Sequence, residues 1–510
     1  MFKYLLAFLF HITFRRLFKF DLRPRLIKYF QSLKFNISPL LHEDPLSRDA
    51  LDYCRKNFLK NKIDEDDKRA FWENHRLDII NQEELDFKTR LGILLLWISS
   101  SKKFNPIIFE NMMETSLRSS NILIFLEKNR EHLSKSDIQL IENILRNTYL
   151  LNIFAPDMYV KRENIKIRDE SNNHFIFCLC FQLLYMNYKK TLSSNEVQNF
   201  FIYFEKRFSN DGFLKEGSTF YSYSISNAIL KFLFLSDFSN IKQFKRIYKS
   251  LCISLNKDID LKNLNFGDRD GTMLLPSIDS DPSFKRFIKK QEFSELSPNE
   301  NIRLIRHGDL KIIVNHRKIY DFGTLGHYHD DFGHFNLYYK DQIIFDPGTL
   351  SYSSAEKRFD SSSYHNALTI NESSSMVNTQ KFEKTFNSVI KTELSDNRLS
   401  IIKSDTYGKW ERVFELNSAV IYDQFRFSDD PLVNIFFKTK PEVSQFDDKG
   451  IAIVLKNVKI EISCNELFNY NIQPSVIAKD YSKSIEAYLL KMNFKKSLEN
   501  RLKWEVICLN

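Results

Sequence analysis

Histidine is concentrated in one part of this chain of 510 residues, with a spacing that suits chemistry. Six of the eleven histidines lie between residues 307 and 365. Within this window the run Gly-His-Tyr-His-Asp-Asp begins at Gly326, and Asp346-Pro347-Gly348-Thr349 and the pair His365-Asn366 follow it. Two imidazoles and a carboxylate are an ordinary ligand set for zinc. The cluster therefore indicates a metal site or a group of catalytic histidines.

His327 and His329 are separated by one residue. On a strand this spacing directs both rings to one face, whereas a helix would separate them. A shared face suits coordination of one ion or stabilisation of one charge. Dividing the two rings between different tasks would require a local bend of the strand.

The elements that must position these residues change character once along the chain. Between about residues 66 and 255, apolar residues recur at helical spacing, with short polar breaks. The runs predict roughly eight helices, among them 87–104, 105–129, 137–153, 174–188, 224–235 and 241–255. Short links between successive helices predict antiparallel hairpins, and hence a bundle, a solenoid or a helical toroid.

After about residue 300 the period of the pattern becomes two. Short strands are predicted on either side of tight turns, at 303–305 and 311–314, 335–339 and 342–345, and 451–455 and 458–462. Such strands without intervening helices predict an antiparallel β-sandwich. We therefore expect a helical domain over residues 41–290 and a sandwich over 300–510, with a ligand cleft between them.

The net charge of +9 comes mostly from the N-terminus, since residues 1–35 hold eight Lys and Arg residues against one Asp. A basic surface for nucleic acid is therefore not expected on the folded body. The apolar run 4–14 is too short to span a membrane and lacks a small-residue cleavage site. Residues 1–40 are consistent with an amphipathic helix packed on the body, a membrane-surface anchor or an atypical export signal.

The motifs from Gly326 to Asn366 resemble the C-terminal signature of the heparinase II/III-like proteins, which are polysaccharide lyases. The family pattern is Gly-His-x-His-x-Asp, a strand, Asp-Pro-Gly-Thr and a His-Asn pair. The segment from Glu216 to Tyr221 resembles the family's Glu-x-Ser-x-x-Tyr segment, and Asn173-His174 resembles its Asn-His helix start. The resemblance implies an α+β two-domain fold, an incomplete (α/α) helical toroid followed by an antiparallel β-sandwich.

The activity that the resemblance implies is β-elimination on a polysaccharide containing uronic acid, with a 4,5-unsaturated product. It implies that Asn173 neutralises the substrate carboxylate and that Tyr221 transfers the proton. His327 would be the partner of Tyr221, as acid, base or carboxylate contact, while Glu216 and His174 would bind substrate. Donors that neutralise the carboxylate lower the barrier to removal of the neighbouring C5 proton.

The metal ligands implied by the resemblance are His329, Asp346 and His365. They would hold one divalent ion, with zinc favoured, and no organic cofactor is expected. The expected partner is an acidic polysaccharide or cell-surface glycan and not nucleic acid, with peripheral membrane contact through residues 1–35 as a further expectation. The family favours the cell envelope or periplasm, whereas the lack of a clear signal peptide favours the cytoplasm.

Three departures from the family pattern concern the catalytic prediction. Ser222 stands where the family often has histidine, Asp360 stands where a basic residue often precedes the His-Asn pair, and Gly333–Asn336 replaces an apolar-Ser-Phe-Glu run. Taken alone, Asn173 could also be a helix cap and Tyr221 a core residue. The alternative function is therefore a catalytically inactive glycan-binding protein on the same scaffold, and a hydrolase comes third because no carboxylate pair is apparent.

Overall fold

The computed structural model describes the helical and the β part of the chain with gaps. Described are residues 48–58, 72–100, 111–154, 173–193, 204–235, 264–267, 282–289, 301–317, 327–350, 361–370 and 376–509, with short interruptions inside these ranges and a few single positions outside them. The predicted N-terminal helix over residues 1–40 and the predicted helix 241–255 lie outside the described residues, apart from residue 246.

The chain divides into two compact units that are interleaved in sequence. Unit 1 comprises residues 1–204, 227–243 and 273–291, and unit 2 comprises residues 205–226, 244–272 and 292–510. Two segments of the predicted helical domain therefore belong to the same unit as the β strands. The domain boundaries at 41–290 and 300–510 stay a prediction.

Unit 1 is helical, as the spacing of its apolar residues predicts. Its described helices are α3 (Arg48–Asn57), α5 (Phe87–Ser100), α6 (Met112–Asn129), α7 (Lys135–Phe154), α8 (Asn173–Tyr188) and α12 (Pro282–Lys289), with 3-10 turns η1 (Asp78–Asn81) and η4 (Arg130–His132). The helix α10 (Thr219–Leu235) begins in unit 2 and continues in unit 1. None of the helices in the described part of the chain is long and apolar enough to cross a membrane.

Local sequence explains where two of these helices begin. The side chain of Asn111 accepts a hydrogen bond from the Glu114 backbone N–H at 3.3 Å, which caps α6. At α7, Ser134 Oγ accepts from the Asp137 N–H at 3.1 Å while the Asp137 carboxylate accepts from the Ser134 N–H at 3.3 Å. This reciprocal pair satisfies two backbone donors that the helix itself leaves free.

Unit 1 also contains a buried ion pair. Arg76 Nε lies 2.5 Å from Glu114 Oε2, and Arg76 Nη2 lies 2.6 Å from Glu114 Oε1. Both side chains are 2% exposed, so neither charge is solvated by bulk water. The neutralisation of each charge by the other permits their burial.

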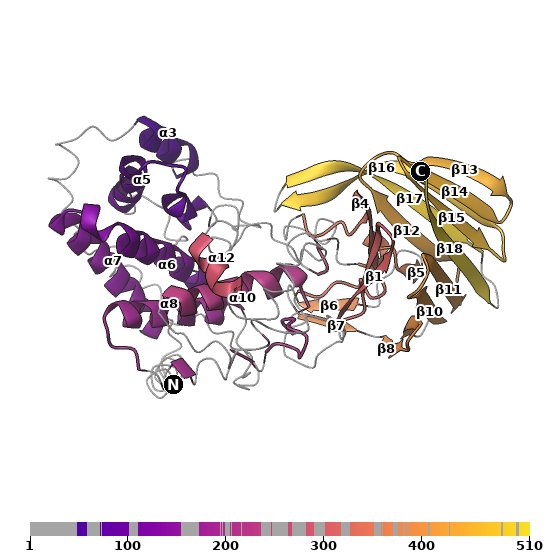
Figure 1. Ribbon diagram of the computed structural model, residues 1–510, viewed down its shortest axis with the longest axis horizontal. Coiled ribbons are helices and arrows are strands. Elements are labelled where there is room, and N and C mark those ends of the chain that lie inside the picture. Colours follow the sequence, from indigo (N-terminus) through magenta and orange to yellow (C-terminus); the bar gives the residue numbers. More distant parts are fainter. Residues whose placement is uncertain are drawn as a thin grey trace. The chain divides into compact units, whose positions relative to one another are not determined.

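Unit 2 contains two antiparallel sheets and a separate hairpin (Figure 1). The first sheet has the order β1-β2-β3-β4-β12-β17-β16, with β5 also paired to β12, and the second has the order β13-β14-β15-β18-β11-β10-β9-β8. The strands of the first sheet are β1 (Ile302–His307), β2 (Leu310–Asn315), β3 (Phe335–Tyr339), β4 (Asp341–Phe345), β5 (Leu368–Ile370), β12 (Pro431–Phe437), β16 (Phe468–Asp480) and β17 (Lys483–Phe494). Those of the second are β8 (Val389–Leu394), β9 (Arg398–Ser404), β10 (Gly408–Glu415), β11 (Val420–Phe427), β13 (Glu442–Asp447), β14 (Gly450–Leu455), β15 (Val458–Cys464) and β18 (Asn500–Cys508), and the hairpin is β6 (Met376–Gln380) with β7 (Glu383–Phe386).

The two sheets share one apolar core, which makes them a sandwich. The Phe335 ring of β3 lies edge-on to Phe414 of β10 and to Trp504 of β18, with centroids 5.8 Å apart in both cases. The buried positions of β10 alternate with half-buried ones, as expected for a strand with one face toward the core. The three predicted hairpins are confirmed as β1–β2, β3–β4 and β14–β15.

Candidate functional site

Tyr221 lies in the first turn of α10, and the sequence before it determines this position. Ser218 Oγ accepts a hydrogen bond from the Tyr221 backbone N–H at 3.0 Å, so Ser218 caps the helix. The Thr219 N–H donates to the Phe266 carbonyl at 3.0 Å, which attaches the helix start to the segment 264–267. Tyr221 itself is buried.

The ring of His327 stacks on the ring of Tyr221. The centroids are 4.1 Å apart and the planes are inclined by 24°. Tyr221 and His327 are both in unit 2, although 106 positions separate their numbers in the chain. The structure therefore brings together two of the three residues predicted to be catalytic.

The third predicted catalytic residue, Asn173, is the first residue of α8 in unit 1, and His174 follows it. The side chains of both lie outside the described part of the structure, as does the whole of Glu216. Their predicted roles in carboxylate neutralisation and substrate binding stay predictions.

The segment that carries His327 and His329 is not a strand, so the condition under which both rings would share a face is not met. Residues 327–334 are irregular, and β3 begins only at Phe335. His327 lies against Tyr221, whereas His329 Nε2 lies 3.4 Å from Thr349 Oγ1. The irregular backbone supplies the local bend that separate tasks would require.

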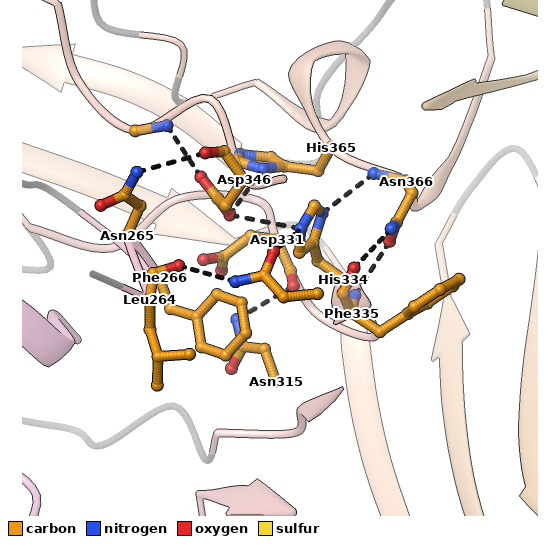
Figure 2. A network of polar contacts seen from close by, with 12 residues as sticks. Leu264, Asn265, Phe266, Asn315, Asp331, His334, Phe335, Asp346, His365 and Asn366 are labelled. Carbon is orange, nitrogen blue, oxygen red and sulfur yellow. Dashed lines mark hydrogen bonds and ion pairs between the residues drawn. The ribbon is translucent and has the colours of Figure 1, made fainter. Parts of the chain in front are cut away.

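His334, at the end of this segment, belongs to a second group of titratable residues. His334, Asp346 and His365 each offer a ligand atom within 4.8 Å of the others, and all three are buried. Figure 2 shows their side chains converging at the start of β3, the end of β4 and the turn before β5. His365 Nδ1 lies 3.2 Å from Asp346 Oδ2, and His334 Nε2 lies 3.8 Å from the same oxygen.

The Asp346 carboxylate is oriented by its own turn. The Gly348 N–H donates to Asp346 Oδ1 at 2.9 Å, which leaves Oδ2 directed at the two histidines. The Gly348 φ of +67° lies in the left-handed region that favours glycine. The Asp-Pro-Gly sequence is therefore the local reason why this carboxylate points into the group.

Electrostatics differ between the two histidines beside Asp346. Burial lowers the pKa of His334 to about 4, so this imidazole is neutral near pH 7. Burial also opposes protonation of His365, but the adjacent Asp346 outweighs it and the pKa of His365 is raised. Burial opposes ionisation of Asp346, yet His365 and His334 together lower the pKa of its carboxyl.

The donor set fits a divalent metal ion. Two ligand atoms bound at about 2.0 Å to one tetrahedral zinc ion are about 3.3 Å apart, close to the His365–Asp346 separation. His365 Nε2 is buried and accepts or donates no hydrogen bond among the described residues. His334, Asp346 and His365 could therefore hold an ion, and the prediction placed Asp346 and His365 in this set.

His329 was predicted as the third ligand, and the structure places it next to the group rather than within it. Its ring centroid lies 5.5 Å from that of His365. His334 takes the third place by distance, but its nitrogens are engaged: Nδ1 accepts from the Asn366 N–H at 3.0 Å, and Nε2 lies 3.1 Å from Asn336 Oδ1. Since the Asn336 amide nitrogen donates to Leu264 O at 3.0 Å, its oxygen faces the imidazole, and Nε2 carries the proton. His334 would have to give up this arrangement to bind a metal through Nε2.

Arg412 supports both histidine segments and was missed in the sequence. Its Nη1 donates to the Gly333 carbonyl at 2.9 Å and to the Asn366 carbonyl at 2.6 Å. Asp423 accepts two hydrogen bonds from the same guanidinium, at 2.7 and 2.9 Å. A signal was present, because Arg412 occupies an inward position of a strand whose alternate neighbours are Trp410 and Phe414.

Comparison with known proteins gives a family model that matches the β part. Residues 295–505 match the family model described as heparinase II/III-like, C-terminal. No curated protein matches the chain.

Several solved structures share the fold. A crystal structure of heparinase III aligns with a TM-score of 0.61 at 14% identity over 96% of this chain and 90% of its own. A heparinase III described as the BT4657 gene product aligns with a TM-score of 0.54 at 15% identity, over 96% and 89%. A mutant of the heparan sulfate lyase HepC from Pedobacter heparinus aligns with a TM-score of 0.53 at 13% identity, over 96% and 83%.

These likenesses agree with the order of elements along the chain. They confirm the predicted fold class, an incomplete (α/α) helical toroid followed by an antiparallel β-sandwich. The family resemblance that rested on His327, Asp346 and His365 is confirmed as well, since residues 295–505 match the heparinase II/III-like C-terminal model.

Proposed function

We propose that this protein is a polysaccharide lyase that cleaves a uronate-containing polysaccharide by β-elimination. The observation that carries the proposal is the stack of Tyr221 and His327 at 4.1 Å, which joins the two motifs at which the resemblance locates proton transfer. The fold shared with heparinase III and heparan sulfate lyase structures supports the same reaction class.

The reaction breaks the C5–H and C4–O bonds of the uronate and forms a C4–C5 double bond. The C5 proton is weakly acidic because the adjacent carboxylate already carries a negative charge. In our proposal the Asn173 amide donates to this carboxylate, which lowers the cost of the charge that develops in the transition state. The Tyr221–His327 pair accepts the C5 proton and gives one proton to the departing C4 oxygen, so that both groups end the cycle in their starting protonation states.

The His327 ring can assist Tyr221 because the two groups are in contact and one of them is buried. A buried phenol that transfers a proton needs a neighbouring group that can accept this proton or return it within the catalytic cycle. An imidazole has an unperturbed pKa of about 6.5 and is suited to that exchange.

We propose further that Asp346 and His365 hold a divalent ion, zinc by preference, with His329 as the third ligand. The tautomer of His334 disfavours its coordination, whereas the ring of His329 lies beside the group, with its centroid 5.5 Å from that of His365. A bound ion would supply positive charge that fixes the segments carrying these residues, and elimination requires no activated water. The glycan would be acidic, as the substrates named for the heparan sulfate lyase relatives are.

The experiment is incubation of the purified protein with a panel of acidic polysaccharides, followed by the ultraviolet absorbance of the unsaturated product. Activity should be lost in Tyr221→Phe and His327→Ala. Tyr223→Phe is the matched control, because it removes a hydroxyl from the same buried helix start without changing the stacked pair.

Full activity in both Tyr221→Phe and His327→Ala would refute these assignments. Tight binding of an oligosaccharide without unsaturated ends would instead indicate the glycan-binding alternative. Ser222 is relevant to this outcome, since its hydroxyl donates to the Ser218 carbonyl at 2.7 Å and accepts from the Leu214 N–H at 2.9 Å. Both bonds serve the local fold of the helix start.

A further inference from the structure

Arg317 is a buried arginine two residues after the end of β2, and it binds three separate parts of unit 2. Its Nη2 lies 2.6 Å from Asp331 Oδ1 and 2.7 Å from Asp331 Oδ2. Its Nε donates to Asn315 Oδ1 at 2.9 Å, and its Nη1 donates to the Gly217 carbonyl. The side chain is 3% exposed and the Asp331 side chain 0%, so the pair is shielded from water.

The partners of Arg317 adjoin the two residues of the stacked pair. Gly217 directly precedes Ser218, the cap of the helix turn that carries Tyr221. Asp331 lies in the same irregular segment as His327, and the Tyr328 ring lies under the Arg317 guanidinium at 5.5 Å. One guanidinium therefore connects the segment before Tyr221 with the segment of His327.

The segment 264–267 contacts both the Asp331 side chain and the start of α10. The Gly267 N–H donates to Asp331 Oδ2 at 3.0 Å, while the neighbouring Phe266 carbonyl accepts from the Thr219 N–H at 3.0 Å. Asp331 thus accepts hydrogen bonds both from Arg317 and from the segment 264–267, which is also bonded to the first residue of α10.

Glycines let these backbones approach one another directly. Gly217 has φ +79°, and a Cβ there would lie 2.2 Å from the Tyr328 ring. Gly267 has φ +73°, and a Cβ there would lie 2.1 Å from the Gly217 carbonyl oxygen and 2.6 Å from that of His327. At this closeness a displacement of one segment must displace the others.

We propose that Arg317 is a positioning residue that sets the relative placement of Tyr221 and His327. The inference rests on the proposed function for its catalytic consequence. Arginine is required because its rigid fork of five donors can serve a carboxylate, an amide oxygen and a carbonyl at once. Asp331 neutralises its charge, so Arg317 acts through the two segments and not on substrate.

The first test is Arg317→Lys in the full chain. Lysine keeps a positive charge for Asp331 but cannot hold Asn315 and Gly217 in the same fixed geometry. A displacement of about 1 Å at reacting groups can cost about a hundredfold in rate, so we expect kcat to fall roughly 10- to 100-fold while KM changes less than about twofold. The double variant Arg317→Met/Asp331→Asn removes both charges and should show the same loss of kcat.

The matched control is Arg76→Lys, at the buried Arg76–Glu114 pair of unit 1. It should lower the melting temperature by an amount similar to Arg317→Lys and leave kcat within about twofold. Retention of kcat in Arg317→Lys, with a loss of stability like that of the control, would overturn the proposal.

A second readout does not depend on activity. The Tyr221 ring, stacked at 4.1 Å, shifts the imidazole proton resonances of His327, and Tyr221→Leu defines their position without the stack. In Arg317→Lys these resonances should move toward the Tyr221→Leu position, whereas Arg76→Lys should leave them in place. Unchanged His327 resonances would overturn the proposal, and a wild type that yields no unsaturated product but shows the shift would refute only the proposed function.

Discussion

Replacement of Arg412 by methionine should destabilise unit 2 strongly. The side chains of Arg412 and Asp423 are both 0% exposed, so the variant leaves a carboxylate that water does not reach. The Gly333 and Asn366 carbonyls lose a charged donor at the same time. Breaking a buried pair by removal of one partner costs about 3–5 kcal/mol.

The expected value lies near the middle of that range. Asp423 keeps hydrogen bonds from the indole N–H groups of Trp410 at 2.9 Å and Trp504 at 2.7 Å, which partly compensate its charge. The two carbonyls left without their donor work in the opposite direction. We expect a loss of about 4 kcal/mol in the free energy of unfolding, or roughly 8–16 °C in melting temperature at about 2–4 °C for each kcal/mol.

The assay is thermal and urea unfolding followed by tryptophan fluorescence, because two of the four tryptophans contact this pair. Arg398→Met is the control, since its ion pair with Glu415 is largely exposed on the arginine side and should contribute less than about 1 kcal/mol. The double variant Arg412→Met/Asp423→Asn should recover about 1 kcal/mol or more relative to the single variant. A single-variant loss no larger than that of Arg398→Met would refute the reasoning.

Three further predictions concern pH, metal and backbone geometry. Burial, with a smaller contribution from Arg118, lowers the pKa of His75 to about 3, so the unfolded chain protonates first as the pH falls below about 6.5. The free energy of unfolding should therefore decrease from pH 6.5 toward pH 3, and His75 alone should contribute up to about 1.4 kcal/mol to this decrease for each pH unit. Urea titrations at a series of pH values should show a smaller decrease in His75→Gln. Mass spectrometry of the purified proteins should find stoichiometric zinc in the wild type and none in Asp346→Asn. A chelator should lower the melting temperature of the wild type but not of the variant. Equal metal content in both proteins would contradict the ligand assignment. Gly217→Ala should lower both stability and lyase activity because its Cβ would meet the Tyr328 ring at 2.2 Å, whereas Gly308→Ala, with nothing within 4 Å, tests the effect of the positive φ alone.

The strand pattern of the β part could be predicted because it is a local property. Alternating apolar residues and tight turns specify the hairpins β1–β2 and β14–β15 without reference to the rest of the chain. The turn at Asp346 was likewise visible in its Asp-Pro-Gly sequence.

The segment of His327 could not be predicted in the same way, because distant partners determine its conformation. Asp331 is engaged by Arg317 and by the Gly267 N–H, and Gly333 has φ +77° with the Trp410 ring 2.7 Å from the place of a Cβ. Those contacts, and not the spacing of His327 and His329, determine where the two rings lie. The membership of residues 205–226 in unit 2 also depends on contacts far along the chain, which periodicity does not record.

The irregular segment before β3 has little freedom to change its length. Its side chains contact different partners: His327 contacts Tyr221, Tyr328 contacts Arg317, His329 contacts Thr349, Asp330 contacts Lys403, Asp331 contacts Arg317 and His334 contacts Asp346. A single inserted or deleted residue would shift all the later side chains by one position, so that each would face the partner of its neighbour. Homologues that keep this site should therefore vary here by substitution and not by insertion or deletion, which an alignment of related chains would reveal.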